Sequence, residues 1–138
     1  MSYARVIPVE FNHCDPAGIV FYPRYFEMAN SLVETFFAEV LDYPFSRIHL
    51  QERCAVPTVR LTCVFSAPSR LGDRIAFALD LTRIGRASAG VQITGHCGPE
   101  LRLTVESVLV WVGPDGRPRP WPEAIRAKMT EFSEGQHR

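Results

Sequence analysis

Residues 22–41 carry apolar side chains on nearly every side of one long helix. The apolar positions recur at helical spacing rather than in alternation. They are Phe26, Met28, Ala29, Leu32, Val33, Phe36, Phe37, Val40 and Leu41. Only a narrow polar strip is left, formed by Glu27, Asn30, Ser31 and Glu34. A helix with so little polar surface needs partners on several sides, so we expect other elements to cover most of it.

Both ends of this helix are marked in the sequence. Pro23 suits the first helical position, where its missing N–H costs nothing, so the helix is expected to begin near Tyr22. The Asp42-Tyr43-Pro44 stretch is expected to end it, because the residue before a proline disfavours the helical conformation. A short helix or irregular segment over Phe45–Glu52 then leads to the next part of the chain.

Five stretches alternate apolar and polar residues in the period-two pattern of β-strands. The first, Tyr3–Phe11, contains Pro8, which cannot donate to a strand ladder and so favours a place near a sheet edge. The other four are Val56–Ala67, Asp73–Ile84, Ala87–Cys97 and Leu101–Val112. The breaks between these four are short, so successive strands are expected to pair antiparallel as a meander.

The 138 residues fit a single domain, long enough to bury most of its apolar surface without metal or disulfide staples. Five strands and one long helix predict an α+β fold with the helix on one face of the sheet. After Gly116, three prolines mark a linker to a C-terminal extension, residues 117–132, with a short helix over Glu123–Phe132. Residues 133–138 are predicted to be disordered.

Charge and cysteine content narrow the classes of function. The formal net charge is zero, so no global field favours nucleic acid or an anionic membrane as a partner. Four cysteines without a C-x-x-C pair, and no signal-like or membrane-spanning apolar run, predict a cytoplasmic protein. The four histidines are too scattered for metal-ligand spacing, so no metal site is expected.

The stretch His13–Tyr25 combines a carboxylate, a tight turn and a helix start. Asp15 precedes Pro16, and Gly18 supplies backbone freedom for the turn. The unpaired N–H groups at a helix start stabilise an oxyanion, and a carboxylate beside them serves as nucleophile or general base. The combination suggests hydrolysis of an activated acyl group. The plainer alternative is that Asp15 only caps a turn or the following helix.

The run Asp15-Pro16-Ala17-Gly18-Ile19-Val20-Phe21-Tyr22-Pro23-Arg24-Tyr25 resembles the signature of the 4-hydroxybenzoyl-CoA thioesterase family, a branch of the hotdog-fold thioesterases. The resemblance covers about residues 3–112, and outside the signature it is mainly one of element order. It implies a hotdog fold, in which an antiparallel five-stranded sheet wraps around one long helix. It also implies that the whole chain is one hotdog thioesterase domain.

The resemblance assigns roles to residues at the start of the helix. Asp15 would either attack the thioester carbonyl, forming an anhydride, or activate water, and the Tyr22 backbone N–H would polarise the carbonyl. Gly18 and Ile19 would line the turn beside the thioester. Some relatives bear an acidic residue where this chain has Asn30, so any substrate contact made through that acid is altered here. A packing role for Asn30 is equally open.

The substrate implied by the resemblance is an acyl-CoA thioester, with no cofactor. An aromatic acyl group is favoured, because Tyr25 and Val56-Pro57-Thr58, with Phe21 and Phe26, are suited to a flat apolar pocket. The same composition would accept a short or branched aliphatic chain.

The phosphates of coenzyme A call for arginines near the mouth of the acyl site. Arg83 and Arg86 flank Gly85 in a tight turn, at a hairpin where the family places basic residues for nucleotide contact. Arg60 is a further candidate.

Two other classes of function fit the same features. A hotdog hydratase or dehydratase would pair an acid with a histidine, and His13 lies near Asp15. A non-catalytic module would bind acyl-CoA without reacting with it.

The sheet edges of such a fold need partners, which predicts a homo-oligomer, a dimer or a tetramer. Hotdog relatives form their sites between subunits. The Asp15 loop of one chain would then face Val56–Arg60 of another.

Overall fold

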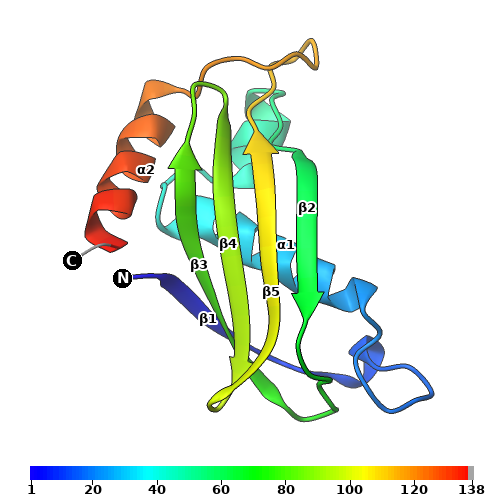
Figure 1. Ribbon diagram of the computed structural model, residues 1–138. Coiled ribbons are helices and arrows are strands. Elements are labelled where there is room, and N and C mark those ends of the chain that lie inside the picture. The colour runs from blue at the N-terminus through cyan, green and yellow to red at the C-terminus, as the bar shows by residue number, and fades with distance from the viewer. Residues whose placement is uncertain (137–138) are drawn as a thin grey trace.

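The computed structural model describes residues 1–136 (Figure 1). Five strands form one sheet, with α1 against one of its faces and α2 beside β3 (Figure 1). The elements are β1 (Tyr3–Pro8), α1 (Pro23–Glu39), β2 (Thr58–Phe65), β3 (Arg74–Ile84), β4 (Ser88–Cys97), β5 (Glu100–Val110) and α2 (Glu123–Gln136). A short 3-10 turn at Phe11–His13 and a π-helical turn at Ser46–Gln51 complete the set.

All strand pairs are antiparallel, in the spatial order β1-β3-β4-β5-β2. The predicted pairing of β3, β4 and β5 as a meander is confirmed. The predicted pairing of β2 with β3 is wrong, because β1 and β4 occupy the two edges of β3 and β2 pairs instead with β5. Residues 66–73 therefore cross from one side of the sheet towards the other.

The first strand lies at a sheet edge, as Pro8 predicts. Its alternation holds through Val9, which is buried, but the strand ends at Pro8 instead of Phe11. Phe11 starts the 3-10 turn and is 84% exposed, since the chain leaves the sheet there.

Helix α1 begins where the sequence predicts, with Tyr22 as its capping residue and Pro23 in the first turn. It is shorter than expected at the other end, where Val40 caps it and Asp42 adopts a φ of +52°. Most of its surface is covered: Tyr25, Met28, Ala29, Leu32, Val33, Phe36 and Phe37 are all buried. They pack into one core with the inward side chains of the sheet, among them Phe77, Leu79, Ile93 and Leu103.

The C-terminal extension is more ordered than the sequence predicts. Helix α2 runs to Gln136, so residues 133–136, expected to be disordered, are helical, while 137 and 138 lie outside the described residues. The reason is packing. Ile125 and Met129 are fully buried, and the ring of Phe132 meets that of Phe36 edge-on with centroids 4.9 Å apart.

Candidate functional site

The loop before α1 is a closed hairpin. Cys14 pairs antiparallel with Val20, and the Phe21 N–H donates to the His13 carbonyl at 2.9 Å. At its tip the Gly18 N–H donates to the Asp15 carbonyl at 2.9 Å, and Gly18 adopts a φ of +81° that other residues rarely accept. The tight turn predicted at Gly18 is present. We call residues 13–21 the Asp15 loop.

The Asp15 side chain is half-buried and makes one hydrogen bond within residues 1–136. Its Oδ1 accepts the Ala17 N–H at 2.9 Å, which is the local turn contact of the plainer alternative. The second oxygen has no protein partner in the described part of the chain. The His13 ring is engaged elsewhere, because its Nδ1 accepts the Glu10 N–H at 2.8 Å. These contacts support no His13–Asp15 pair.

The Tyr22 N–H points to no acceptor in the part of the chain that the structure describes. The next residue is Pro23, which has no N–H. The following two amides are paired, Arg24 with the Phe21 carbonyl at 2.9 Å and Tyr25 with the Tyr22 carbonyl at 3.1 Å. A free amide at the positive end of a 17-residue helix is a suitable donor to a polarised carbonyl.

An apolar cavity of about 300 Å³ opens beside this helix start. It is lined by Ile19, Val20, Tyr22, Tyr25, Phe65, Ser66, Ala67 and Pro68. The ring centroids of Tyr22, Tyr25 and Phe26 all lie within 6.4 Å of the Phe65 centroid. The Tyr22 and Phe26 centroids are also 6.4 Å apart. We therefore call this cavity the aromatic pocket. It gathers three residues named from the sequence: Ile19, Tyr22 and Tyr25.

Sequence reasoning missed the wall that Phe65 and residues 66–68 supply. The only signal for it is the end of the alternating pattern at Ala67-Pro68, which locates a strand end without saying what it faces.

Two predicted groups of residues lie away from this pocket within one chain. Val56, Pro57 and Thr58 precede or begin β2, whereas the pocket contacts the other end of that strand at Phe65. Asn30 is exposed on α1 and lies outside the lining of the pocket.

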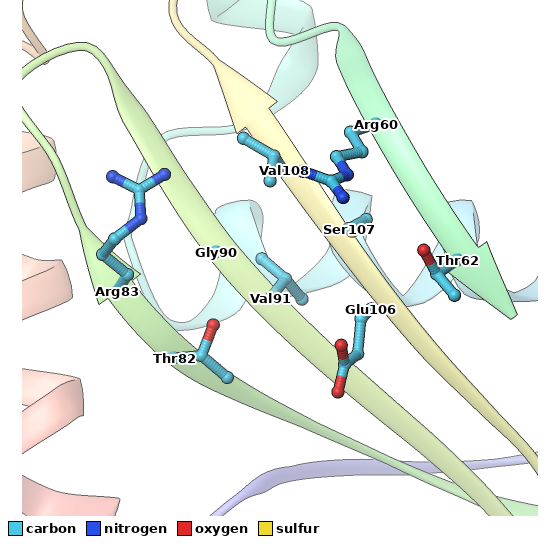
Figure 2. Close-up of a pocket in the computed structure, with 9 residues that line it drawn as sticks. All are labelled: Arg60, Thr62, Thr82, Arg83, Gly90, Val91, Glu106, Ser107 and Val108. Carbon is cyan, nitrogen blue, oxygen red and sulfur yellow. The ribbon is translucent and has the colours of Figure 1, made fainter.

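A second cavity, of about 310 Å³, lies on the sheet face turned away from α1 (Figure 2). Arg60 on β2 and Arg83 on β3 face each other across it, and Gly90 between them has no side chain (Figure 2). A Cβ at Gly90 would lie 2.5 Å from Thr82 Oγ1, so a side chain there would obstruct the cavity. We call it the arginine groove.

Arg86 does not line the arginine groove. It is exposed in the β3–β4 turn, and Arg83 Nη2 donates to Ser88 Oγ at 3.1 Å in the same hairpin. The structure thus brings two of the three predicted CoA-binding arginines together and sets the third at the neighbouring turn.

The model of the thioesterase-like superfamily matches residues 9–129. The chain belongs to this superfamily. Similar solved structures include a gentisyl-coenzyme A thioesterase, at 24% identity and a TM-score of 0.84, covering 92% of this chain and 99% of that one. A 1,4-dihydroxy-2-naphthoyl-CoA thioesterase from Synechocystis matches at 18% identity and a TM-score of 0.87, over 96% and 98% of the two chains. No curated protein sequence matches.

A third similar structure is a Staphylococcus aureus protein in complex with CoA, at 13% identity and a TM-score of 0.89, covering 97% of this chain and 85% of that one. At these identities the likeness concerns the fold, and it confirms the hotdog arrangement expected from the signature.

Strand β2 forms an exposed apolar edge of the sheet. It is the last strand of the sheet, and it is exposed along nearly its whole length. Val59, Leu61, Val64 and Phe65 are 43–60% exposed, and Phe21 and Tyr22 add exposed rings near one end. A long exposed edge with large apolar side chains presents unpaired backbone groups and apolar surface to which another chain can add a strand.

Neither helix in residues 1–136 combines the length and apolar character needed to cross a membrane. In the same residues, no three His, Cys, Asp or Glu side chains gather into a group that would hold a metal ion.

Proposed function

We propose that this protein hydrolyses an acyl-CoA thioester to a free acid and CoA, as an enzyme of the 4-hydroxybenzoyl-CoA thioesterase type. The observation that carries the proposal is the Tyr22 N–H at the start of α1, which has no acceptor among residues 1–136 and lies beside the aromatic pocket and the Asp15 loop. An amide donor, a carboxylate and an acyl-sized cavity at one helix end are the parts that thioester hydrolysis needs.

The acyl carbonyl would accept a hydrogen bond from the Tyr22 N–H, which stabilises the charge that develops on oxygen. The carboxylate of Asp15 then acts in one of two ways. It attacks the carbonyl carbon and expels CoA as a thiolate, leaving an anhydride that water hydrolyses. Alternatively, it takes a proton from a water molecule that attacks the same carbon. Both routes yield the same acid and thiol.

An aromatic acyl group fits the pocket best. Aromatic rings pair edge-on or offset with other rings, and Tyr22, Tyr25 and Phe65 surround the cavity. Two structurally similar proteins are thioesterases of gentisyl-CoA and 1,4-dihydroxy-2-naphthoyl-CoA, both aromatic. A short or branched aliphatic group is the alternative, since apolar walls discriminate weakly between shapes of similar size.

The CoA moiety would lie along a second copy of the chain. Arg60 and Val56–Thr58 lie towards the opposite end of β2 from the aromatic pocket, and Arg83, on β3, lines the same groove as Arg60. If two β2 edges pair antiparallel about their middle, the Phe65 end of one strand meets the Thr58 end of the other. The aromatic pocket of one chain would then lie beside the Val56–Thr58 end of its partner's β2, and the CoA moiety would reach the partner's arginine groove (Figure 2) on the other face of the joined sheet, with Arg86 at the adjoining turn.

A thiol-release assay over a panel of acyl-CoAs tests the proposal. The panel holds benzoyl, hydroxybenzoyl, naphthoyl, short linear and branched acyl groups, with an α,β-unsaturated acyl-CoA to detect hydration. We expect release of CoA, fastest with an aromatic acyl group. Hydration without thiol release would favour the hydratase class, and binding without any reaction would favour a binding module.

A further inference from the structure

The connection from β2 to β3 supplies part of the aromatic pocket. Since β5 and β4 separate these strands, this crossover loop (residues 66–73) spans about 14 Å of sheet. Its first part, residues 66–68, lines the aromatic pocket. The carbonyl of buried Ser69 accepts the Val20 N–H at 2.9 Å, so the loop also contacts the Asp15 loop.

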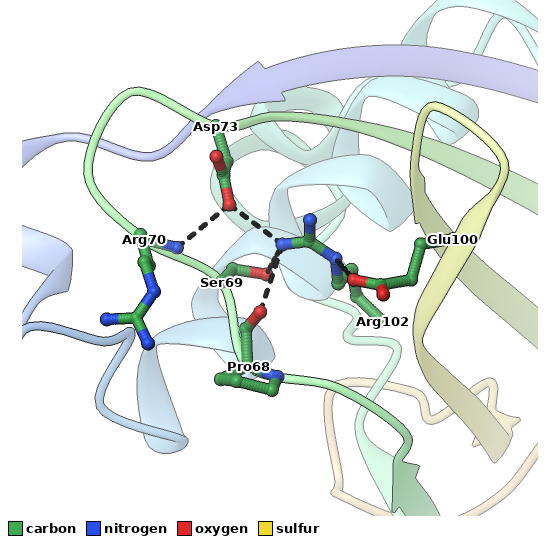
Figure 3. Close-up of polar contacts among 6 residues, drawn as sticks. All are labelled: Pro68, Ser69, Arg70, Asp73, Glu100 and Arg102. Atoms are coloured by element: carbon green, nitrogen blue, oxygen red, sulfur yellow. Dashed lines mark hydrogen bonds and ion pairs between the residues drawn. The ribbon is translucent and has the colours of Figure 1, made fainter.

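Arg102 on β5 is the main polar anchor of the crossover loop (Figure 3). Its carbonyl accepts the N–H groups of Ser66 at 2.8 Å and Ala67 at 3.3 Å. Its Nη1 lies within hydrogen-bond distance of the Pro68 carbonyl at 3.0 Å and Ser69 Oγ at 3.1 Å. One residue of β5 therefore contacts four successive residues of the loop.

The same guanidinium fixes the far end of the loop through charge. Arg102 Nη1 lies 2.8 Å from Asp73 Oδ2, and Arg102 Nε lies 2.7 Å from Glu100 Oε1. The hydrogen bond from Arg102, with a second from the Arg70 N–H at 2.9 Å, lowers the pKa of Asp73 and keeps this carboxylate ionised. The Arg102 side chain is only 12% exposed, so solvent screens the pair weakly.

We propose that Arg102 is a positioning residue for the hydrolytic site, an inference that rests on the proposed function. It fixes the crossover loop, which shapes the pocket wall, and the Ser69–Val20 hydrogen bond transmits this position to the Asp15 loop. Displacement of the loop would shift the acyl group and Asp15 relative to each other. Misplacement of reacting groups by about 1 Å can lower a rate on the order of a hundredfold.

The geometry asks for arginine in particular. Arg102 Nη1 donates to the loop oxygens while Nε of the same guanidinium lies at ion-pair distance from Glu100, and a lysine ammonium cannot occupy both places at once. Arg102→Lys keeps the positive charge but cannot make the contacts of Nη1 and Nε at the same time, whereas Arg102→Met removes both the charge and the contacts. Arg117→Met is the matched control, because Arg117 is an exposed arginine in the turn after β5, outside every contact described above.

Steady-state kinetics separate positioning from mere stability. We expect Arg102→Met to lower kcat by about 10- to 100-fold, with KM for the acyl-CoA changed by less than about threefold. Arg102→Lys should give an intermediate kcat, and Arg117→Met the wild-type value. A purely structural role would lower the melting temperature and leave the kcat of the folded enzyme unchanged, which would overturn the proposal.

Hydrogen exchange at the Val20 amide provides a readout that needs no substrate. We expect faster exchange at Val20 in both Arg102 variants, with protection in β3 and β4 unchanged. Unaltered exchange at Val20 would also overturn the proposal. If Arg102→Met does not fold, Asp73→Asn and Ser69→Ala each remove one contact and should lower kcat in the same direction. Absence of activity in the wild-type protein would instead refute the proposed function.

Discussion

Asp15 combines a structural and a proposed chemical task in one side chain. Its Oδ1 closes the turn by accepting the Ala17 N–H, while no protein group in residues 1–136 satisfies Oδ2. An asparagine keeps the turn contact, because its amide oxygen accepts the same hydrogen bond. The two tasks can therefore be separated by substitution.

Asp15→Asn is expected to abolish thioester hydrolysis while the melting temperature and CoA affinity stay near those of the wild type. Thiol release, thermal unfolding and calorimetric CoA binding measure the three quantities. Asp42→Asn, at an exposed carboxylate beyond α1, is the control and should leave the rate unchanged. A rate for Asp15→Asn within about tenfold of wild type would refute the assignment.

Asp15→Glu should lower the hydrolysis rate on the order of a hundredfold, because the reacting oxygen moves by about 1 Å.

Local residues of the site are predictable from sequence, and distant ones are not. Pro16 restricts the backbone of Asp15, Gly18 permits the positive φ of the turn, and Pro23 marks the helix start, so the turn and the position of the Tyr22 amide could be inferred. Arg102 contacts side chains and carbonyls 29–34 residues earlier in the chain. No spacing rule links positions so far apart, and only the strand order brings them together.

At the scale of elements, the β3–β4 hairpin carries the predicted CoA contacts and is fastened by the C-terminal segment. Arg126 Nη2 donates to the Gly85 carbonyl at 2.7 Å and to the Arg86 carbonyl at 3.2 Å. The Trp121 indole N–H donates to the Ser88 carbonyl at 3.0 Å. These contacts fix the backbone of the β3–β4 turn, and with it the positions from which the Arg83 and Arg86 side chains extend.

The combined variant Arg83→Ala and Arg86→Ala is expected to raise KM for acyl-CoA more than it lowers kcat. Both side chains would contact the CoA phosphates far from the reacting carbon, and the effect should shrink as salt screens the charges. Kinetics at low and high ionic strength measure this. Removing two cations elsewhere, at Arg117 and Lys128, is the control. An unchanged KM at low salt would place the nucleotide site elsewhere.

The crossover loop should make the stability of the fold depend on pH. Hydrogen bonds from Arg102 and the Arg70 N–H lower the pKa of Asp73 from its ordinary value of 3.8. The folded state thus binds this proton more weakly than the unfolded state, so the ionised carboxylate stabilises the fold above about pH 4. That contribution is lost as the pH falls through the lowered pKa.

Urea unfolding of the wild type and Asp73→Asn, between about pH 7 and pH 3, measures this contribution. We expect the wild type to be more stable near neutral pH and the difference to narrow in acid. A difference that stays constant over the whole range would contradict the assigned role of Asp73.

The sequence predicts which stretches form strands and helices, but it predicts only part of how these elements pair and pack. Alternation and helical spacing located the five strands and α1. The break at residues 68–72 resembles a hairpin turn in length, yet it crosses the sheet because β1 occupies the edge of β3 that β2 would need. Likewise, the burial of Ile125 and Met129 that keeps α2 helical to Gln136 depends on packing against the rest of the fold.

At the scale of the whole molecule, the two halves of the proposed site lie apart in one chain. The aromatic pocket contacts the Phe65 end of β2, whereas Arg60 and Thr58 lie towards the start of the strand. The long apolar edge of β2 lies between them. The family resemblance implies both halves of the site, and the exposed β2 edge between them is the reason to expect that a second copy unites them.

We therefore expect a homo-oligomer, at least a dimer, joined through β2. Leu61→Asp places a charge in the middle of that edge, where the side chain is 43% exposed, and should give a folded monomer with little thioesterase activity. Val6→Asp is the control, because Val6 is 47% exposed on β1, the other edge of the sheet, and should leave the dimer and its activity intact. Light scattering at micromolar concentration, circular dichroism and thiol release measure assembly, folding and activity. A monodisperse wild-type monomer with full activity would contradict a shared site, because a single chain would then bind and hydrolyse the acyl-CoA without its partner.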